Sequence, residues 1–550
     1  MPSAPPAFPA QPVPSPTPAT FPSRPIYDLF DEPWIPVLWR AGTAGGRGVE
    51  RPGTVGLHQL LLCAHEIEQV AVAVPPALSA LYRVLYAVTA RLAGLDEAGP
   101  RDGAGPQGDW SERRVGLADR GFFDPAEVEA FVADNRHRFD LFHPVRPFLQ
   151  DPRLAGQCDP QNTAGVDKLI TTRPSGNNHA WFRHVDAAAP NLPSPAEAVL
   201  HLLVWHYYGP SGRCSSRTAG DVKAANSSAG PLRSSLSYHP EGESLFETLL
   251  AGLPEPGARV SRATDLCPWE WVELPDPAGV PPVLKGRCSE LTARSQHALL
   301  LVPDATGGRV KDAFITWAYR DKISREGDPY LIWQTSKEGN AYPRPADSQR
   351  ALWRDLDALL LKDPAGSAEP RRPAVFFTAA EVSEYLRVRA LGFEQDGQAK
   401  DVQFVDATTP PVLELAEENE PELAVQVGRL RMLGERYGNR LDRAVKKAWA
   451  VFTEAPKIRD CTWAVDAAAR YWPAAEAEFW RRLNARDFDG AAAAFRLIAE
   501  RAYDTVTHGA LGTLRGAKAC SGARVELYGG PVKATPKTAV PGRSTNTENT

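Results

Sequence analysis

The clearest hydrophobic pattern in the first half of the chain is helical and covers residues 75–95. Its apolar residues recur at three- and four-residue spacing: Leu78, Leu81, Leu85, Val88 and Leu92. Pro75 and Pro76 stand where a helix accepts proline, in its first turn. The spacing therefore predicts a helix whose apolar face is buried in the core.

Shorter apolar patterns surround this helix. The stretch 26–42 predicts a short strand entered through a turn, and the apolar spacing of residues 56–72 predicts a helix. "HALLLVPD" at 297–304 and "DAFITWAY" at 312–319 are strand candidates. The polar stretch 209–235 is rich in small residues and predicts a long loop.

The pattern changes near residue 410, where Ala, Leu, Arg and Glu dominate. One stripe at helical spacing runs through Leu430, Leu433, Tyr437, Leu441, Val445 and Trp449. Three or four long segments of this kind, joined by short turns, predict a helical bundle. No internal repeat is present.

These patterns together predict an α+β fold. Because strand and helix candidates do not alternate regularly before residue 410, a large irregular mixed domain fits better than a doubly wound sheet. We expect four parts, described from the N-terminus: a disordered arm at 1–25, a mixed α+β domain at 26–408, a four-helix bundle at 409–526 and a disordered tail at 527–550.

The arm contains ten prolines and no acidic residue in its first 25 positions. This composition predicts a disordered, partly polyproline segment and lacks the apolar core of a signal peptide. A plain extension is the favoured interpretation, and a proline-recognition motif is the alternative.

Charge and cysteine content narrow the function. The chain has 550 residues, 43% hydrophobic and 23% charged, with a formal net charge of −5. Any nucleic-acid contact must therefore be local, because no general basic excess exists. Seven cysteines occur singly without a CxxC pair, which favours a reducing cytoplasm and argues against a zinc knuckle.

Common catalytic signatures are missing from the sequence. It has no GxxxxGK[ST] loop, no GxGxxG after a strand and no GxSxG elbow. "HEIEQ" at 65–69 lacks the second histidine of a zinc helix, so His65 is expected on a helix near the surface. We assign no catalytic residue, metal or cofactor.

The stretch "TTRPSGNNHAWFRH" at 171–184 is the most distinctive polar segment. His179 and His184 lack further ligands at suitable spacing, so a metal site is disfavoured, and Trp181 and Phe182 fit core anchors. The Gly-Asn-Asn turn permits close backbone approach to a partner such as a DNA minor groove. From the residues alone, a solvent-exposed turn is the safer interpretation. "LGFEQDGQAKD" at 391–401 is likewise read first as a hairpin turn.

Several blocks in order resemble one family, the CasA family, which forms the large subunit of the type I-E Cascade complex of CRISPR immunity. The blocks are "LFDEPWIPV", "FDLFHPVRPFLQ", "GVDKLITTRPSGNNHAWF", "SLFETLLAGLP" and "DPYLIWQTSKEGNAYP", followed by the helical C-terminus. The resemblance spans nearly all of residues 27–520.

The resemblance implies a non-enzymatic subunit that inspects duplex DNA for a protospacer-adjacent motif and helps open the duplex. Its implied partners are the other Cascade subunits, the guide RNA, target double-stranded DNA and a helicase-nuclease, with no membrane contact. A purely structural scaffold and, less favoured, a metal-dependent hydrolase are the alternatives.

The resemblance also implies DNA-binding positions. A loop that meets the motif from the minor groove matches Ser175, Gly176, Asn177, Asn178 and His179. A wedge glutamine matches Gln398, with Gln395 as the alternative. A groove-reaching lysine matches Lys322, with Lys311 as the alternative. Paired cysteines found in some relatives are absent here.

Overall fold

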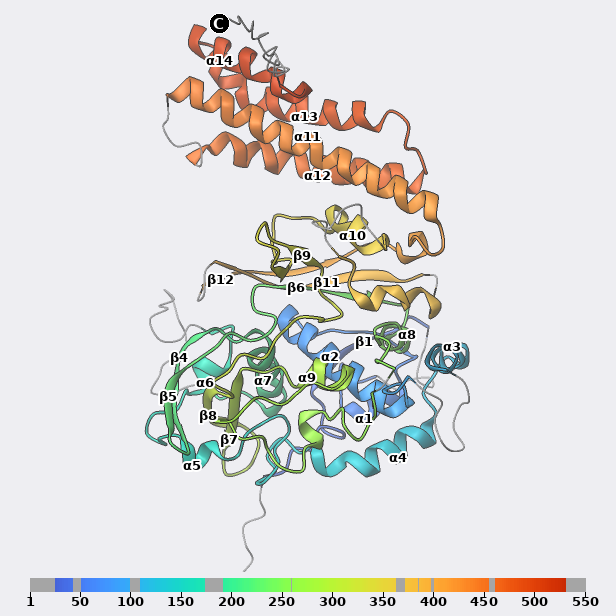
Figure 1. Cartoon of the computed structure of the whole chain (residues 1–550), viewed down its shortest axis with the longest axis vertical. Coiled ribbons are helices and arrows are strands. Elements are labelled where there is room, and N and C mark those ends of the chain that lie inside the picture. Colours follow the sequence, from blue (N-terminus) through green and yellow to red (C-terminus); the bar gives the residue numbers. More distant parts are fainter. Residues whose placement is uncertain are drawn as a thin grey trace, which may run out of the picture.

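The computed structural model describes residues 25–42, 51–98, 109–173, 191–258, 260–362, 371–383, 385–396, 400–454 and 460–530. These residues form a mixed body of helices and short strands that carries a bundle of helices at its C-terminal end (Figure 1). The predicted fold class, α+β with a C-terminal helical bundle, is therefore confirmed.

Helix α2, Pro75–Ala93, is the central helix of the body. It begins with the two prolines that the sequence places there and ends at Gly94, whose φ of 64° is a left-handed conformation that glycine adopts without strain. Every residue of α2 is buried. The predicted helix and its core face are confirmed, but the burial extends around the whole helix.

A three-stranded antiparallel sheet covers one side of α2. Its strand order is β12-β11-β6, formed by Lys400–Thr408, Arg387–Asp396 and Leu236–Glu241. In Figure 1 the sheet lies as a layer between α2 and the C-terminal bundle. The sheet therefore connects the two large parts of the molecule.

The other predicted strands are also present. β7, His297–Pro303, and β8, Val310–Trp317, pair antiparallel, and β1, Ile35–Trp39, pairs with two short strands. The remaining body elements are β2 Thr54–Val55, α3 Trp110–Arg120, α4 Pro125–Asn135, α5 Leu154–Gln157, α6 Val166–Leu169, α7 Pro195–Tyr208, α8 Leu245–Ala251, α9 Arg287–Thr292, β9 Trp333–Thr335, β10 Ala341–Pro343 and α10 Leu356–Leu360.

The expected helix at 56–72 is wrong in its second half. Helix α1 covers Leu57–Leu62 only, and the chain then turns into strand β3, Ile67–Val70. β3 pairs with β1, and this tertiary pairing overrides the local helical spacing. His65 lies in the turn between α1 and β3, so its predicted place on a helix is also wrong.

The expected loop at 209–235 is wrong as well, because it contains the hairpin of β4, Gly212–Ala219, and β5, Val222–Ser227. β4 buries a charged residue: the guanidinium of Arg217 donates to Asp151 at 2.6 Å and to the Trp317 carbonyl at 3.0 Å. A strand whose inward positions are polar gives no alternating apolar signal, so the sequence pattern could not reveal it.

A buried ion pair joins three segments of the body. Arg83 of α2 donates to both carboxylate oxygens of Asp328, at 2.7 and 3.0 Å, and to the hydroxyl of Ser237 in β6 at 3.1 Å. Both side chains of the pair are almost fully buried. Burial lowers the pKa of Arg83, but the charge and hydrogen bonds of Asp328 outweigh it, so the pKa is raised.

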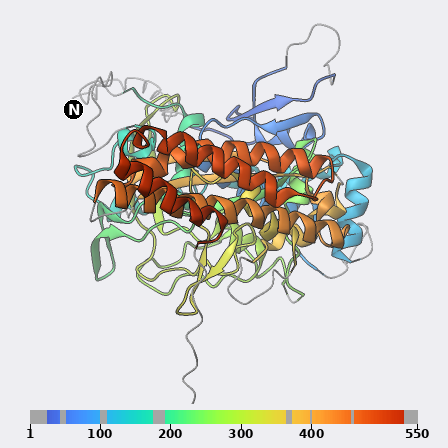
Figure 2. The same cartoon turned by 90° about the horizontal axis from the view of Figure 1, so that it is seen from above.

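The C-terminal bundle consists of α11 Pro421–Thr453, α12 Thr462–Asn484, α13 Ala491–Thr507 and α14 Leu514–Arg524. α11 contacts each of the other three helices, and Figure 2 shows the bundle lying across the body. On the predicted stripe, Leu430, Tyr437, Leu441 and Val445 are buried and Leu433 and Trp449 are partly buried. The predicted stripe is confirmed.

The bundle is joined to the body by an aromatic and charged contact. The buried ring of Trp353 packs against α11 at Gly434, and Arg354 stacks 3.6 Å above the ring of Trp472 in α12. Glu435 accepts hydrogen bonds from Arg354 at 2.7 Å and from Arg350 at 3.1 Å. Burial raises the pKa of Glu435, but these arginines outweigh it and the pKa is lowered.

Replacement of Asp328 tests the buried pair. We expect Asp328→Asn to lower the free energy of unfolding by about 3–5 kcal/mol, because it leaves the Arg83 charge buried without a counter-ion. The matched control is Asp504→Asn, which removes the half-exposed pair with Arg524 and should cost less than about 1 kcal/mol. If chemical denaturation shows that the two variants lose equal amounts of unfolding free energy, the stabilising role given to the buried Arg83–Asp328 pair is wrong.

Replacement of Gly434 tests the contact between bundle and body. A Cβ atom at Gly434 would lie 2.6 Å from the Trp353 ring, so we expect Gly434→Ala to lower the free energy of unfolding by about 1–3 kcal/mol. In α14, a Cβ at Gly522 meets nothing within 4 Å, so Gly522→Ala should be neutral or stabilising by up to about 1 kcal/mol. Thermal or denaturant unfolding of both variants distinguishes a packing effect from a general effect of helical glycines.

Candidate nucleic-acid interface

The predicted minor-groove loop lies outside the described residues. Ser175, Gly176, Asn177, Asn178 and His179 fall in residues 174–190, together with Trp181, Phe182 and His184. Their predicted roles stay predictions. The described residues on either side show only where this segment leaves and re-enters the fold.

The two ends of that segment meet at the start of α7. The guanidinium of Arg173 donates to the carbonyl of Asn191 at 2.7 Å, which joins the last described residues before the segment to the first after it. The backbone N–H of Thr171 donates to Nδ1 of His201 at 3.2 Å, and the Thr171 hydroxyl lies 3.0 Å from the same nitrogen. Burial and the nearby charge of Arg173 lower the pKa of His201 to about 4, so this anchor is neutral.

The predicted hairpin at 391–401 is present as the end of β11 and β12. The last backbone pair is Asp396 with Lys400, and Gln398 lies in residues 397–399, outside the described part of the chain. Gln395 is described and held within the fold: its side-chain oxygen accepts from the backbone N–H of Ser234 at 2.6 Å and from the Ser234 hydroxyl at 3.2 Å. Ser234 has a φ of 61°, the left-handed conformation that a serine rarely adopts.

The two candidate lysines are exposed and lie at opposite ends of β8. Lys311 is beside Val310, whose N–H donates to the Pro193 carbonyl at 3.0 Å, close to the end of the 174–190 segment. Lys322 follows β8, between Arg320, which donates to the Asn226 carbonyl at 2.9 Å, and Arg325, whose guanidinium lies 3.4 Å from the Ser235 hydroxyl. Lys322 therefore belongs to the same neighbourhood as Ser234 and the β11–β12 hairpin.

Helix α7 separates the loop anchor from the hairpin anchor. His201 in the middle of α7 holds Thr171, and the Tyr207 carbonyl near the C-terminus of the helix accepts from Leu232 at 2.8 Å, two residues before Ser234. At 1.5 Å per residue, the six-residue step from His201 to Tyr207 sets these anchors about 9 Å apart along the helix axis.

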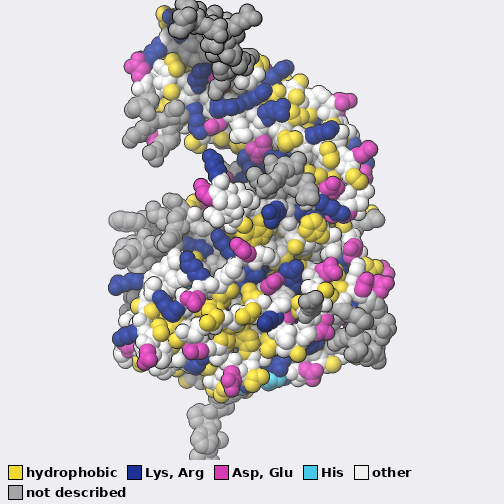
Figure 3. Space-filling view, in the orientation of Figure 1, with side chains coloured by type: hydrophobic (Ala, Val, Ile, Leu, Met, Phe, Trp, Pro, Cys, Tyr) yellow, Lys and Arg dark blue, Asp and Glu magenta, His cyan; other side chains and the backbone are white. Residues whose placement is uncertain are grey.

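Basic side chains occupy the flank between the two anchors. Arg213 and Lys223 are exposed on β4 and β5, and Nζ of Lys168 donates to the Arg213 carbonyl at 3.2 Å. In Figure 3, Lys and Arg side chains occur along the flank that carries β4, β5 and β8, with acidic side chains among them. The flank thus offers local positive groups on a chain whose net charge is −5.

Sequence reasoning missed the residues that hold these segments in place. Arg173, His201 and Ser234 are anchors whose importance depends on partners about 18 to 161 positions away. None has a local motif. Only the unusual serine conformation marks one of them, and that conformation is visible only in the structure.

Two other kinds of site find no support in the described part of the chain. Among the described residues, no group of three or more His, Cys, Asp or Glu side chains is arranged to hold a metal ion. No helix in the described ranges has the length and apolarity that crossing a membrane requires.

Fold and site together define a class: a large α+β protein with a C-terminal helical bundle and, on one flank, two anchored polar segments flanked by basic side chains. The chain belongs to the CRISPR-associated protein Cse1 family, whose model matches residues 28–508. The family inferred from the sequence blocks is thereby confirmed.

Known relatives agree with this membership. A chain described as a CRISPR RNA-guided surveillance complex is 40% identical, with a TM-score of 0.81 over 92% of this chain and 100% of that one. The structure of Thermus thermophilus CasA (Cse1) has a TM-score of 0.68 at 22% identity, over 92% of this chain and 99% of that chain. In sequence, the CRISPR-associated protein CasA/Cse1 of Thermus thermophilus is 30% identical over 356 residues, which span 61% of this chain and 60% of that relative.

The buried histidines of this region predict an acid-sensitive fold. Burial lowers the pKa of His201, His206 and His297 from 6.5 to about 4. As pH falls from about 6.5 to about 4, the unfolded chain binds protons that the folded chain does not, so the free energy of unfolding decreases through this window. Denaturant titrations at several pH values measure the slope.

A variant of His206 isolates one contribution. His206→Gln keeps a side chain that can donate to the Leu149 carbonyl, which His206 contacts at 2.8 Å, but removes the titration. We expect it to reduce the loss of stability between about pH 6.5 and 4. His508→Gln, at an exposed position, should leave the slope unchanged, and an unchanged slope in both variants would contradict the assignment.

Proposed function

We propose that this chain is the non-catalytic large subunit of a type I-E RNA-guided surveillance complex in the cytoplasm. Its membership of the Cse1 family over residues 28–508 is the observation that carries this proposal. The structural similarity over the whole length of a chain described as an RNA-guided surveillance complex supports the same role. In such assemblies, base pairing with the guide RNA reads most of the sequence, and protein contacts read a short adjacent motif.

The subunit's part would be to recognise that motif in target double-stranded DNA from the minor groove. Small polar side chains and the backbone near Gly176, with Ser175, Asn177, Asn178 and His179, suit the degenerate pattern of the minor groove and would give tolerant readout. The anchored position of Arg173 and Asn191 beside a flank with basic side chains supports this role for the segment between them.

A glutamine wedge would promote duplex opening and R-loop formation. Insertion of a side chain between base pairs costs a few kcal/mol of unstacking, which new contacts and guide pairing can offset. The hydrogen bonds from Ser234 to the side chain of Gln395 favour Gln398 as the wedge, because a side chain held inside the fold is not available for insertion.

Lys322 is favoured over Lys311 as the lysine that reaches the groove. The segment that carries Lys322 contacts residues 226–235, and Ser234 in turn holds Gln395 close to the turn of the β11–β12 hairpin. A lysine in this place could act on the same stretch of DNA as the wedge.

The remaining proposed partners are the other Cascade subunits, the guide RNA and the helicase-nuclease that the complex recruits.

Replacement of the wedge tests recognition in the reconstituted complex. We expect Gln398→Ala to weaken binding of a duplex carrying the correct motif by about ten-fold, in line with about 1–3 kcal/mol for loss of a specific contact. Gel-shift titrations with correct and scrambled motifs measure the effect. If the complex binds both duplexes equally with and without this subunit, the recognition role is wrong. The alternative, a purely structural scaffold subunit, would then be favoured.

The two lysines give a matched pair for the groove contact. Lys322→Ala should weaken motif-dependent binding and reduce its salt dependence, whereas Lys311→Ala, at the other end of β8, should leave both near the unmodified values. If only Lys311→Ala weakened binding, Lys311 and not Lys322 would be the lysine that reaches the groove. DNA cleavage by the purified chain alone would instead support a hydrolase.

A further inference from the structure

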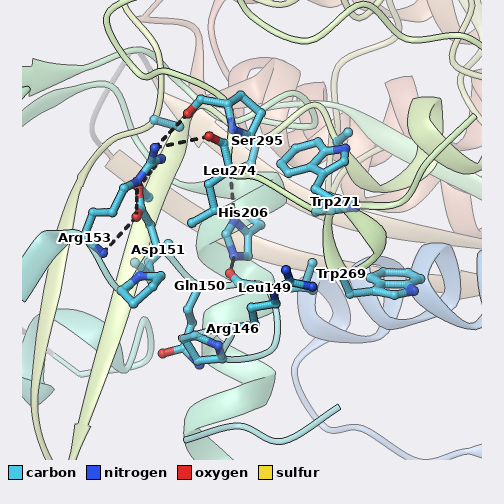
Figure 4. A pocket seen from close by; sticks show the side chains of 18 of the residues that line it. Arg146, Leu149, Gln150, Asp151, Arg153, His206, Trp269, Trp271, Leu274 and Ser295 are labelled. Atoms are coloured by element: carbon cyan, nitrogen blue, oxygen red, sulfur yellow. Dashed lines mark hydrogen bonds and ion pairs between the residues drawn. The ribbon is translucent and has the colours of Figure 1, made fainter. Parts of the chain in front are cut away.

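One cavity in the described part of the chain lies beside β7 and the end of β8. It has a volume of about 610 Å³ and is formed between residues 144–153, residues 268–275 and the start of β7. Its walls include the aromatic rings of Trp269, Trp271 and Tyr319. In Figure 4, Trp269 and Trp271 stand on one side of the cavity, opposite Arg153 and Asp151. The volume suits a drug-sized ligand or a short peptide segment.

Two arginines of the cavity are already engaged by the protein. Arg146 donates to the Val272 carbonyl at 2.9 Å, and Arg153 donates to the Pro275 carbonyl at 3.0 Å and to Asp151 at 2.8 Å. These bonds tie the two walls together across the cavity. An anionic ligand would have to compete with them, so an uncharged occupant is favoured.

The buried histidine of the cavity is satisfied as well. Nε2 of His206 donates to the Leu149 carbonyl and Nδ1 lies 2.8 Å from the Ser295 hydroxyl oxygen. Burial lowers the pKa of His206 to about 4, which keeps the ring neutral. His206 therefore supports the wall and offers no charge to a ligand.

The aromatic residues, by contrast, retain unused donors. No hydrogen bond within the described ranges uses the indole N–H of Trp269 or Trp271 or the hydroxyl of Tyr319. Val272 and Val145 at the rim are exposed by 75% and 64%. Aromatic faces with free N–H or O–H donors, beside exposed apolar side chains, are the surface that polyproline II segments bind, because proline carbonyls accept hydrogen bonds.

The residues that directly follow the proline-rich arm lie near this cavity. The backbone N–H of Tyr27 donates to Asp140 at 3.2 Å, and the Tyr27 carbonyl accepts from Leu141 at 2.9 Å. Gln150, which lines the cavity, donates to the Leu141 carbonyl at 2.8 Å. Two successive hydrogen bonds, by way of Leu141, thus join Tyr27 to the cavity-lining Gln150, and Pro25 lies next to Gly307 in the turn between β7 and β8.

The preceding residues have the length and composition to reach it. Residues 1–24 contain nine of the ten prolines counted up to Pro25, and they have no acidic side chain. At about 3.1 Å per residue in a polyproline II helix, they would span roughly 70 Å, which is ample for a return to the cavity.

We propose that this cavity binds the chain's own proline-rich arm, residues 1–24, as a polyproline II segment packed against Trp271. The arm then acts as an intramolecular ligand that covers an aromatic surface of the body. Its attachment next to the cavity gives it a high effective concentration, so docking requires only modest intrinsic affinity.

Fluorine NMR of the full chain labelled with 5-fluorotryptophan tests docking in place. The Trp271 resonance is identified with Trp271→Phe. We expect replacement of Pro12, Pro14, Pro16 and Pro18 by alanine, in the arm only, to shift the Trp271 resonance and to leave that of Trp463 in the bundle unchanged. An unchanged Trp271 resonance would overturn the proposal.

A peptide titration provides the second test. A synthetic peptide of residues 1–24 should bind a chain that begins at Pro25, and should bind the full chain at least ten-fold more weakly because the arm competes. Trp271→Ala in the shortened chain should reduce affinity at least ten-fold, whereas Trp463→Ala should not. Failure of the peptide to bind, or binding unaffected by Trp271→Ala, would refute the site. Equal binding by full and shortened chains would refute docking of the arm and indicate a proline-rich segment from another chain.

Discussion

The contact between Arg83 and Asp328 is the constraint on which the arrangement of the body depends. α2 is buried on all sides, so the charge of Arg83 has no route to solvent and must be neutralised inside the protein. Its partner lies 245 positions away, and Arg83 also stacks 4.9 Å from the ring of Tyr330. The pair therefore fixes the segment around residue 328 against the central helix and against β6.

The Arg83–Asp328 pair helps to position two parts of the candidate interface. β6 pairs with β11, which carries the hairpin toward Gln398, and the segment before Asp328 carries Lys322. Ser234 joins them, because it precedes β6 and binds Gln395. A wedge and a lysine that are expected to act on one DNA site are thus attached to one rigid buried group, and this limits their relative movement.

The acidic balance of the chain agrees with a binding role that is local. With a net charge of −5, the isolated chain would attract DNA weakly, and its binding would depend strongly on salt. The exposed arginines and lysines of β4, β5 and the segment after β8 supply positive groups on this flank. Trp353, Arg354 and Glu435 attach the bundle firmly to the body.

The sequence by itself determined the elements whose signal is local and apolar: α2, the strands β7 and β8, the stripe of α11 and the hairpin at 391–401. Its ordered blocks also determined the family. It could not determine the strand nature of residues 67–70 or 212–227, because their pairing partners and the buried polar partners of Arg217 are distant in sequence. Only the tertiary structure decided that Gln395 is held by Ser234, that the two lysines lie at opposite ends of β8, and that an aromatic cavity lies near the residues that follow the proline-rich arm. The physical reason is the same in each case: these properties arise from hydrogen bonds and burial between segments far apart in the chain, and no local periodicity encodes them.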